Sequence, residues 1–462
     1  MAEHCRIGAG SGYWGDMLDP ALELIEGGDI RYICFDLLAE LTVAILQRSK
    51  LRDPAKGHIP DLEHIIRESL EPSLRREVVI VTNGGGANPS AGAAASARVA
   101  CELGHGHVRF GVIEGDDLTD RVAEIRAQGW KFGNLETGEE DIDAIADRVV
   151  AAHAYLGSDG IVEALGEGAH VVLGGRLADS ALYCGPLMHH FSWSFEQGDW
   201  ALIGAALTIG HVLECAGIAS GGMSSQWRTS HEPWHLGFPL ADVAPDGTAT
   251  ITKVAGSGGV VNQWTTKEHL LYEVHDPANY LLPDGVVDMS DVEVRETGPD
   301  EVRITGMSGR PRPDTLKVQI GYEDGYLAEG RALFPWPDAL EKADWSENLV
   351  RRRLEYLGIE TLEQRYDRVG IDALAGPIAP PADYEPNEVE LRMAVRCRTR
   401  REAEQARRAL LLPATAGPVG TAFGAPVAVR KIIGLWPTLV PRELVHEHVT
   451  VTTAKETVNA SA

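Results

Sequence analysis

The stretch that decides the fold is Val171–Asp179, which reads VVLGGRLAD. Its apolar start ends at two glycines, and an amphipathic run begins near Ser180. This pattern predicts a buried parallel strand, a tight turn and then a helix. In open α/β sheets the carboxyl ends of such strands carry the ligands, because backbone amides and helix N-termini meet there. The stretch therefore predicts an α/β fold, with a Rossmann-like, mostly parallel sheet flanked by helices, and places Arg176 and Asp179 at its functional edge.

Three other apolar runs end in the same way. Val78–Val81 leads into TNGGGANP, and Val108–Ile113 leads into EGDD. Ile33–Phe35 leads into Asp36. For the two aspartates of EGDD the competing interpretation is helix capping, since carboxylates favour helix N-termini. Because parallel strands deliver their polar ends to one edge, we expect a substrate-binding rim. Its members are Asp36, Asn83, Gly84, Gly85, Gly86, Asn88, Asp116, Asp117, Gly174 and Gly175.

The N-terminal segment has the spacing of a dinucleotide-binding loop, GxGxxG, at Gly10, Gly12 and Gly15. Asp36 would then stand where such loops use a ribose-binding acid. Three features oppose this interpretation: the first strand is short, Asp16 would bring a carboxylate beside a pyrophosphate, and Pro20 indicates a late helix start. The alternatives are a plain glycine turn and a rim loop in which Asp16 contacts substrate. NAD therefore stays open as a cofactor.

Two histidine motifs lie between residues 201 and 235. His211 and Glu214 share a face of the helix predicted over Ala201–Cys215, because they are three residues apart. Such a pair can be an acid–base couple, two metal ligands or a local hydrogen bond. His231–His235 spells HExxH, but Pro233 inside the motif predicts a loop and not a zinc-binding helix. No spacing demands a metal, although a divalent ion held by rim carboxylates is not excluded.

The chain divides into three predicted segments by its pattern of helices and strands. Residues 1–225 are expected to form the Rossmann-like domain, in which Ile142–Tyr155 has a helical pattern. Residues 226–335 form a β-rich segment that completes the site, where Lys253 and Ser257 border a glycine loop suited to a phosphate or carboxylate. Residues 336–462 are expected to form a long helix and a small ferredoxin-like α+β layer, with a frayed end after Val451.

Composition limits the classes of function. The chain has 462 residues, 44% of them hydrophobic, and a formal net charge of −26. Such a surface repels phosphate backbones, so nucleic acid is not expected as a partner. The six cysteines form no CxxC pair, and no leader or membrane-length apolar run occurs, so we expect a cytoplasmic protein with reduced thiols and no membrane association. Apolar helix faces lead us to expect a homo-oligomer.

Taken together, these loops resemble the acyclic terpene utilisation AtuA family, over nearly the whole chain. The resemblance is carried by seven blocks in order: VTNGGGANP at Val81–Pro89, EGDD at Glu114–Asp117, GGRLADSAL at Gly174–Leu182, GHVLECAG at Gly210–Gly217, GFPLADV at Gly237–Val243, ITKVAGSGG at Ile251–Gly259 and LLYEVHDPANY at Leu270–Tyr280. It implies a role in the breakdown of acyclic terpenes and related branched acids, whose intermediates are coenzyme A thioesters. Longer relatives carry a further C-terminal domain, so the resemblance also implies a separate polypeptide in that place.

The leading hypothesis is an enzyme that hydrates, dehydrates or cleaves a small acyl thioester. Asp179 or Glu214 would act as the base and His211 as the acid. Arg176 or Lys253 would hold an anionic group of the substrate, and the glycine amides of the rim would stabilise an enolate oxygen. The alternatives are a nicotinamide-dependent oxidoreductase, a non-catalytic subunit of an acyl-CoA-processing complex, and a hydrolase. The nucleophile of the hydrolase would be one of Ser180, Cys184 and Cys215.

Overall fold

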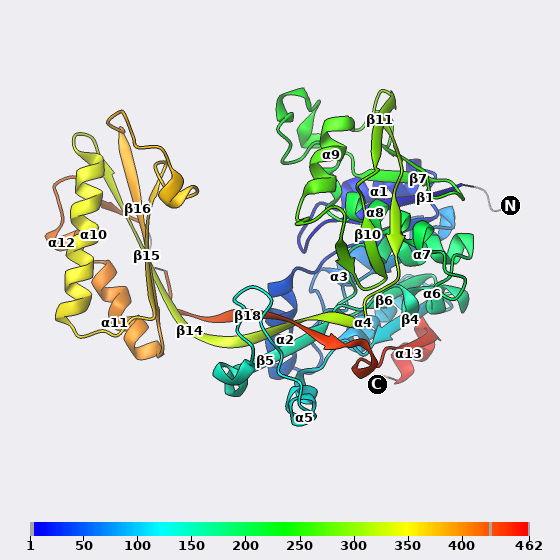
Figure 1. Cartoon of the computed structure of the whole chain (residues 1–462), viewed down its shortest axis with the longest axis horizontal. Helices are drawn as coiled ribbons and strands as arrows, with labels where there is room; N and C mark the ends of the chain where they lie inside the picture. Colours follow the sequence, from blue (N-terminus) through cyan, green and yellow to red (C-terminus); the bar gives the residue numbers. More distant parts are fainter. Residues whose placement is uncertain (1–3, 425–426, 461–462) are drawn as a thin grey trace. The chain divides into compact units, whose positions relative to one another are not determined.

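A ten-stranded sheet lies at the centre of the larger part of the chain in the computed structural model, which describes residues 4–424 and 427–460 (Figure 1). Five neighbouring strands run parallel, in the order β1 (Cys5–Ser11), β2 (Tyr32–Phe35), β3 (Val79–Thr82), β6 (Val171–Gly174) and β4 (Arg109–Glu114). These strands are short, almost continuously apolar runs, as expected for strands buried on both faces. The central strand pattern predicted from the sequence is confirmed.

Antiparallel strands extend the sheet at both edges. Beyond β1 lie β7 (Pro239–Val243), β8 (Ala249–Lys253), β12 (Glu301–Thr305) and β11 (Glu293–Gly298), and beyond β4 lies β19 (His448–Thr453). The hairpin between β7 and β8 turns at Asp246-Gly247. The sheet is therefore mixed, with a parallel centre.

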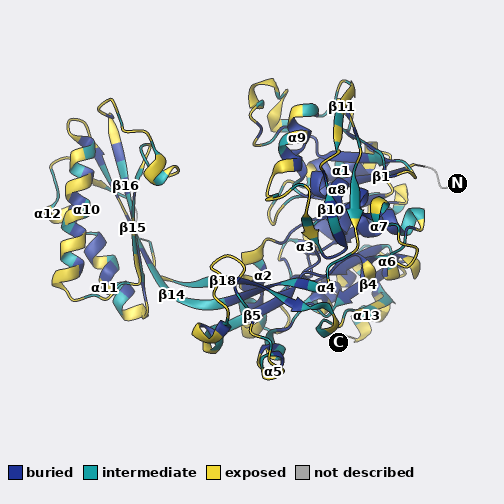
Figure 2. Cartoon of the chain, viewed as in Figure 1, coloured by how far each residue is buried: buried dark blue, intermediate teal, exposed yellow. Residues whose placement is uncertain are grey.

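Two groups of helices flank the sheet. In one group the packed neighbours are α1 (Asp19–Gly27), α3 (Leu62–Arg76), α4 (Pro89–Glu102) and α13 (Ala454–Ala460). In the other they are α6 (Asp159–Gly166), α7 (Ala181–Phe191) and α8 (Trp200–Leu213). Figure 2 shows the strands and the inward helix faces as the buried part of this unit.

Smaller elements surround these layers. A three-stranded sheet of β9 (Tyr280–Leu282), β10 (Gly285–Asp288) and β13 (Ser308–Arg310) contacts α8 through β10 and β13. The remaining helices of the unit are α2 (Glu40–Arg52), α5 (Val122–Ala127) and α9 (Gln263–Leu271). The HExxH motif is a short 3₁₀ turn at Pro233–His235, so the predicted absence of a zinc-binding α-helix is confirmed.

The chain divides into two compact units, and their limits differ from the three predicted ranges. One unit comprises Met1–Gly321 with Leu435–Ala462, and the other comprises Tyr322–Gly434. Residues 226–321 continue the central sheet of the first unit, and β19 returns the C-terminal segment to the same sheet. The Rossmann-like and ferredoxin-like assignments stay predictions.

The second unit has its own core. Its strands are β15 (Glu363–Val369), β16 (Glu388–Cys397), β17 (Ala422–Phe423), most of β14 (Thr315–Pro335) and the start of β18 (Arg430–Pro441), all members of a six-stranded sheet. Its helices are α10 (Ala339–Tyr356), α11 (Arg400–Leu410) and α12 (Pro413–Ala416). Alternate residues of β16 are buried against α10 and α11, which gives this unit a separate hydrophobic cluster.

Two local predictions were wrong. Ile142–Tyr155 contains two 3₁₀ turns and then β5 (Val149–Ala154), which pairs with β14. That strand pairing overrides the helical pattern of the segment. The C-terminal end forms α13 as far as Ala460, and residues 461–462 lie outside the described part. In the described part of the chain no helix is both long and apolar enough to cross a membrane.

Candidate functional site

The turn between β6 and α7 holds a buried arginine. Arg176 is 2% exposed, and its Nη2 donates to Asp179 Oδ1 at 2.7 Å. Its Nη1 donates to the carbonyl of Leu38 at 2.6 Å, and its guanidinium lies 4.2 Å from the centre of the Tyr155 ring. Its Nε has no hydrogen-bond partner among the described residues. Arg176 therefore contacts residues that follow several strands, and its Nε–H has no acceptor among the described residues.

The loop after β2 meets the loop after β3 beside this arginine. Asn83 Nδ2 donates to Asp36 Oδ1 at 2.7 Å, and its Oδ1 accepts the amide of Leu37 at 2.8 Å. Burial raises the pKa of Asp36 well above its usual range, and the charge of Asp179 adds to this effect. These contacts hold residues 36–39 as a loop, so α2 begins only at Glu40.

Of the two carboxyls of Asp36 and Asp179, only that of Asp179 reaches solvent. The side chain of Asp179 is 34% exposed, whereas Asp36 is buried. Partial burial raises the pKa of Asp179 to about 7, opposed by Arg176 and reinforced by the charges of Glu214 and Glu40. A carboxyl with a pKa near neutrality populates both protonation states at cellular pH. Asp179 can therefore take up and release a proton.

A histidine–glutamate pair at the C-terminal end of α8, His211 with Glu214, lies next to this cluster. His211 Nδ1 is 3.0 Å from Glu214 Oε1, and Ser180 Oγ donates to Glu214 Oε2 at 2.9 Å. A Cβ at Gly210 would lie 2.6 Å from the carbonyl of Ser180, so glycine permits this close approach of α8 to the start of α7. Burial lowers the pKa of His211, but the charge of Glu214 prevails, and the net shift is upward. The pair favours an imidazolium.

Sequence reasoning missed several residues of the cluster. His269 is fully buried, and its ring centre lies 5.7 Å from that of His211. Burial and the charge of His211 lower the pKa of His269 to about 3, so it stays neutral. Tyr280 stacks edge-on against His211 at 5.4 Å. Tyr280 ends the block LLYEVHDPANY, and His269 directly precedes this block within α9, so their nearness to a family block was the available signal.

Asp116 and Asp117 lie on the β4 side of the rim. Asp116 Oδ2 accepts the amide of Arg176 at 2.9 Å and lies 2.8 Å from His153 Nδ1. A Cβ at Gly175 would lie 2.3 Å from Asp116 Oδ1, so only glycine fits there. Asp117 pairs with Lys50 at 3.2 Å and caps the turn at Thr119. Asp116 thus positions the Arg176 turn, whereas Asp117 has the capping role that the sequence also suggested.

The glycine amides of the rim are committed to protein acceptors. Gly84 donates to Thr82 Oγ1 at 2.9 Å, and Gly86 donates to the carbonyl of Asn83 at 3.1 Å. Gly85 donates to the carbonyl of Gly174 at 3.1 Å. As they stand, these amides shape the loop and do not form the oxyanion site suggested by the sequence. Asn88 is likewise occupied, since its Nδ2 donates to the carbonyls of Pro54 and Lys56 and its Oδ1 accepts the amide of Ala91.

The N-terminal glycine loop does not fit a dinucleotide. Asp16 Oδ2 accepts the amide of Gly12 at 2.9 Å, which occupies a donor that a pyrophosphate would need. A Cβ at Gly12 would lie 2.7 Å from the backbone of Cys215, so this glycine serves packing. α1 starts at Asp19, four residues after Gly15, and its N-terminus is therefore not at the loop. The interpretation as a glycine turn accounts for these residues.

Lys253 and Ser257 form a closed loop of their own. Lys253 Nζ donates to the carbonyl of Ser257 at 2.7 Å and pairs with Asp300 at 3.1 Å. Ser257 Oγ donates to the carbonyl of Val254 at 2.7 Å. Among the described residues no hydrogen bond or ion pair joins either of them to Arg176 or Asp179, so Lys253 and Ser257 do not belong to the cluster.

The candidate nucleophiles are poorly activated. Burial raises the pKa of the thiols of Cys184 and Cys215. Ser180 donates to a carboxylate and has no histidine partner, unlike a serine nucleophile beside its base. Among the described residues no group of three or more His, Cys, Asp and Glu side chains has the arrangement of a metal site.

Comparison with known proteins adds one finding. The sequence model of the acyclic terpene utilisation family protein AtuA matches residues 5–451. No curated protein and no solved structure matches the chain. The matched range includes every residue of the cluster described above, as the resemblance of the seven sequence blocks led us to expect. The chain belongs to the acyclic terpene utilisation AtuA family.

Proposed function

We propose that this protein is an enzyme of acyclic terpenoid and branched-acid breakdown that acts on a small acyl thioester. Its reaction is of the hydro-lyase type, adding or removing water, with carbon–carbon cleavage as the related possibility. Family membership supports the metabolic setting. The observation that carries the reaction type is a partly exposed Asp179 with a pKa of about 7, hydrogen-bonded to Arg176 and electrostatically coupled to Glu214 beside His211.

In the dehydration direction, Asp179 takes the proton from the carbon next to the thioester carbonyl of a 3-hydroxyacyl substrate. The electron pair forms the new carbon–carbon double bond as the C3 hydroxyl leaves. His211, as the imidazolium, gives its proton to that hydroxyl, which departs as water. Asp179 then releases its proton to solvent, and His211 takes up a proton from solvent. Hydration is the same sequence in reverse.

Charge accumulates on the thioester oxygen during proton removal, and it needs a fixed donor. The positive charge of the Arg176 guanidinium supports this role, because the rim glycine amides are already bonded. The Tyr155 ring and the Leu38 carbonyl hold the guanidinium in place. Glu214 acts on His211 as a positioning residue, keeping it charged and oriented.

The test is mass spectrometry of the purified chain with a panel of branched enoyl-CoA and 3-hydroxyacyl-CoA esters. Gain or loss of one water supports the hydro-lyase, and release of a shorter acid supports carbon–carbon cleavage. Release of the intact acid would indicate a thioesterase instead. No change across the panel, with or without NAD and magnesium, would contradict the proposal and favour a non-catalytic subunit of an acyl-CoA-processing complex.

A further inference from the structure

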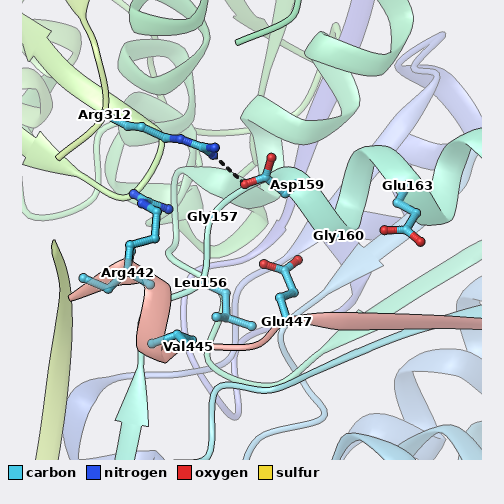
Figure 3. Close-up of a pocket in the computed structure, with 10 residues that line it drawn as sticks. Leu156, Gly157, Asp159, Gly160, Glu163, Arg312, Arg442, Val445 and Glu447 are labelled. Atoms are coloured by element: carbon cyan, nitrogen blue, oxygen red, sulfur yellow. Dashed lines mark hydrogen bonds and ion pairs between the residues drawn. The ribbon is translucent and has the colours of Figure 1, made fainter. Parts of the chain in front are cut away.

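A second site lies at the start of α6, in a cavity of about 220 Å³ that Figure 3 shows in close-up. Two guanidinium groups, those of Arg312 and Arg442, converge on one side of it. Three carboxylates, those of Asp159, Glu163 and Glu447, complete its charged lining. Leu156 and other apolar side chains complete the lining. The cavity therefore has a cationic wall and an acidic wall.

The two guanidiniums differ in their partners. Arg312 pairs with Asp159 at 2.7 Å. Arg442 donates from Nε to the carbonyl of Pro313 at 3.2 Å and from Nη2 to the carbonyl of Pro283, which are neutral acceptors. Among the described residues no carboxylate pairs with Arg442 within 4.0 Å. Burial, and next to it the charge of Arg312, lower the pKa of Arg442, and the opposing charges of Asp284, Asp159 and Glu447 do not cancel this shift. An anion placed between the two guanidiniums would relieve both effects.

The acidic wall contains the buried carboxyl of Glu447. Glu447 Oε1 is buried without a hydrogen-bond partner among the described residues. A Cβ at Gly160 would lie 2.1 Å from this oxygen, so the glycine makes room for the carboxyl at the first turn of α6. Burial first, and then the charge of Asp159, raise the pKa of Glu447 to about 8. A cationic donor beside Glu447 would stabilise its carboxylate.

Neither charge alone suits the cavity. A simple anion would leave Glu447 without a cationic partner, and a simple cation would meet the two guanidiniums. A molecule with both charges at short separation satisfies both walls. The cavity is also smaller than the roughly 300–1,000 Å³ of sites for drug-sized ligands. We propose that this cavity binds a small zwitterion of the α-amino acid class, with its carboxylate on Arg442 and Arg312 and its ammonium group on Glu447 and Asp159.

This proposal is independent of the thioester reaction, because its residues belong to another cavity. It is tested by isothermal titration calorimetry at pH 7 with three matched sets of probes. Each set contains an α-amino acid, its deaminated carboxylic acid and its decarboxylated amine: glycine, acetate and methylamine; alanine, propionate and ethylamine; leucine, 4-methylpentanoate and 3-methylbutylamine. We expect saturable binding by at least one amino acid, and binding at least about tenfold weaker for its two single-charge partners.

Variants identify the cavity as the place of binding. Glu447→Gln keeps the shape of the side chain and is expected to weaken binding at least about tenfold, as is Arg442→Gln. Glu443→Gln, an exposed neighbour with the same change of charge, is expected to bind as the natural chain does. Circular dichroism checks that each variant is folded. If Arg442→Gln does not fold, the binding measurement on Glu447→Gln alone tests the location of the site.

Three results would overturn the proposal. Equal binding of the carboxylic acid alone would indicate an anion site. Amino acid binding that Glu447→Gln leaves unchanged would place the ligand elsewhere. No binding by any probe would leave a structural cavity only.

Discussion

Arg176 is the residue on which the buried charges of the rim depend. It is 2% exposed and lies beside Asp179, with the carboxyl of Asp36 electrostatically linked to it. Removing one partner from a buried charge pair leaves the other uncompensated, which is more costly than never having the pair. The stability of this edge of the sheet therefore depends strongly on the guanidinium of Arg176.

Arg176→Gln is expected to lower the free energy of unfolding by about 3 kcal/mol, the lower end for a buried pair because Asp179 keeps 34% exposure. Urea denaturation measures the change. Arg98→Gln, on the exposed side of α4, is the control and is expected to stay within about 0.5 kcal/mol of the natural chain. Equal stabilities of the two variants would contradict this role of Arg176.

The raised pKa of Asp179 also predicts how stability depends on pH. Between pH 4 and the folded pKa of about 7, the folded chain binds more protons at this carboxyl than the unfolded chain does. The free energy of unfolding should therefore decrease as the pH rises through that window. Asp179→Asn removes this contribution, so its denaturation midpoint should decline less than that of the natural chain between pH 5 and 8. Parallel declines would contradict the assignment.

Residues that end a strand could be predicted from the sequence, whereas residues brought in by tertiary pairing could not. Arg176, Asp179 and Asp36 meet because parallel strands share an edge, which follows from the sequence pattern alone. Tyr155 and His153 enter the rim through β5, whose segment has a helical pattern. Their placement depends on pairing with β14, more than 150 residues later, and no local pattern encodes that.

At the scale of elements, α8 brings its histidine to the rim already paired. The three-residue spacing of His211 and Glu214 predicted a shared face, and the structure places them 3.0 Å apart. What the sequence could not decide was whether the pair is acid–base or structural, because that depends on Ser180 and on the neighbouring Asp179.

Glu214→Gln is expected to lower the pKa of His211, because it removes the charge that opposes desolvation of the imidazolium. Nuclear magnetic resonance titration of the histidine ring protons follows this pKa directly. His235, which pairs with Glu23, serves as the control in the same spectra and should titrate unchanged. An unshifted His211 would mean that Glu214 does not keep it charged.

The turn between β6 and α7 depends on the close approach of Asp116. Gly175→Ala would place a Cβ 2.3 Å from Asp116 Oδ1 and push the turn away. We expect it to lower the free energy of unfolding by about 1–3 kcal/mol, as overpacking does. Gly166→Ala, where nothing lies within 4 Å of the new Cβ, is the matched control and should be neutral or stabilising. Thermal unfolding of both variants decides, and equal effects would contradict the packing argument.

At the scale of the molecule, each of the two units has its own hydrophobic cluster. The domain limits at residues 225 and 335 were predicted from changes between helix-like and strand-like sequence patterns. Those patterns could not show that the C-terminal strand β19 pairs with β4. Strand pairing between segments more than 300 residues apart leaves no signal in composition or periodicity. The central sheet was predictable because its parallel strands are near-continuous apolar runs.

Leu391→Ala removes a fully buried side chain from the core of the Tyr322–Gly434 unit. We expect it to destabilise that unit by about 2–5 kcal/mol and to leave the unfolding of the larger unit unchanged. Leu240→Ala, in the central sheet, is the reciprocal control. Differential scanning calorimetry should then show a different transition shifted in each variant. One transition that moves equally in both would mean that the units unfold together.

The central claim is that Asp179 moves a proton on an acyl thioester. Mass spectrometry of a branched 3-hydroxyacyl-CoA in heavy water tests it most directly, with the natural chain beside Asp179→Asn. We expect the natural chain to incorporate deuterium next to the thioester carbonyl and to release water. We expect Asp179→Asn to do both at least about a hundredfold more slowly, because it lacks the general base. An unchanged mass with the natural chain, or equal rates for the two proteins, would contradict it.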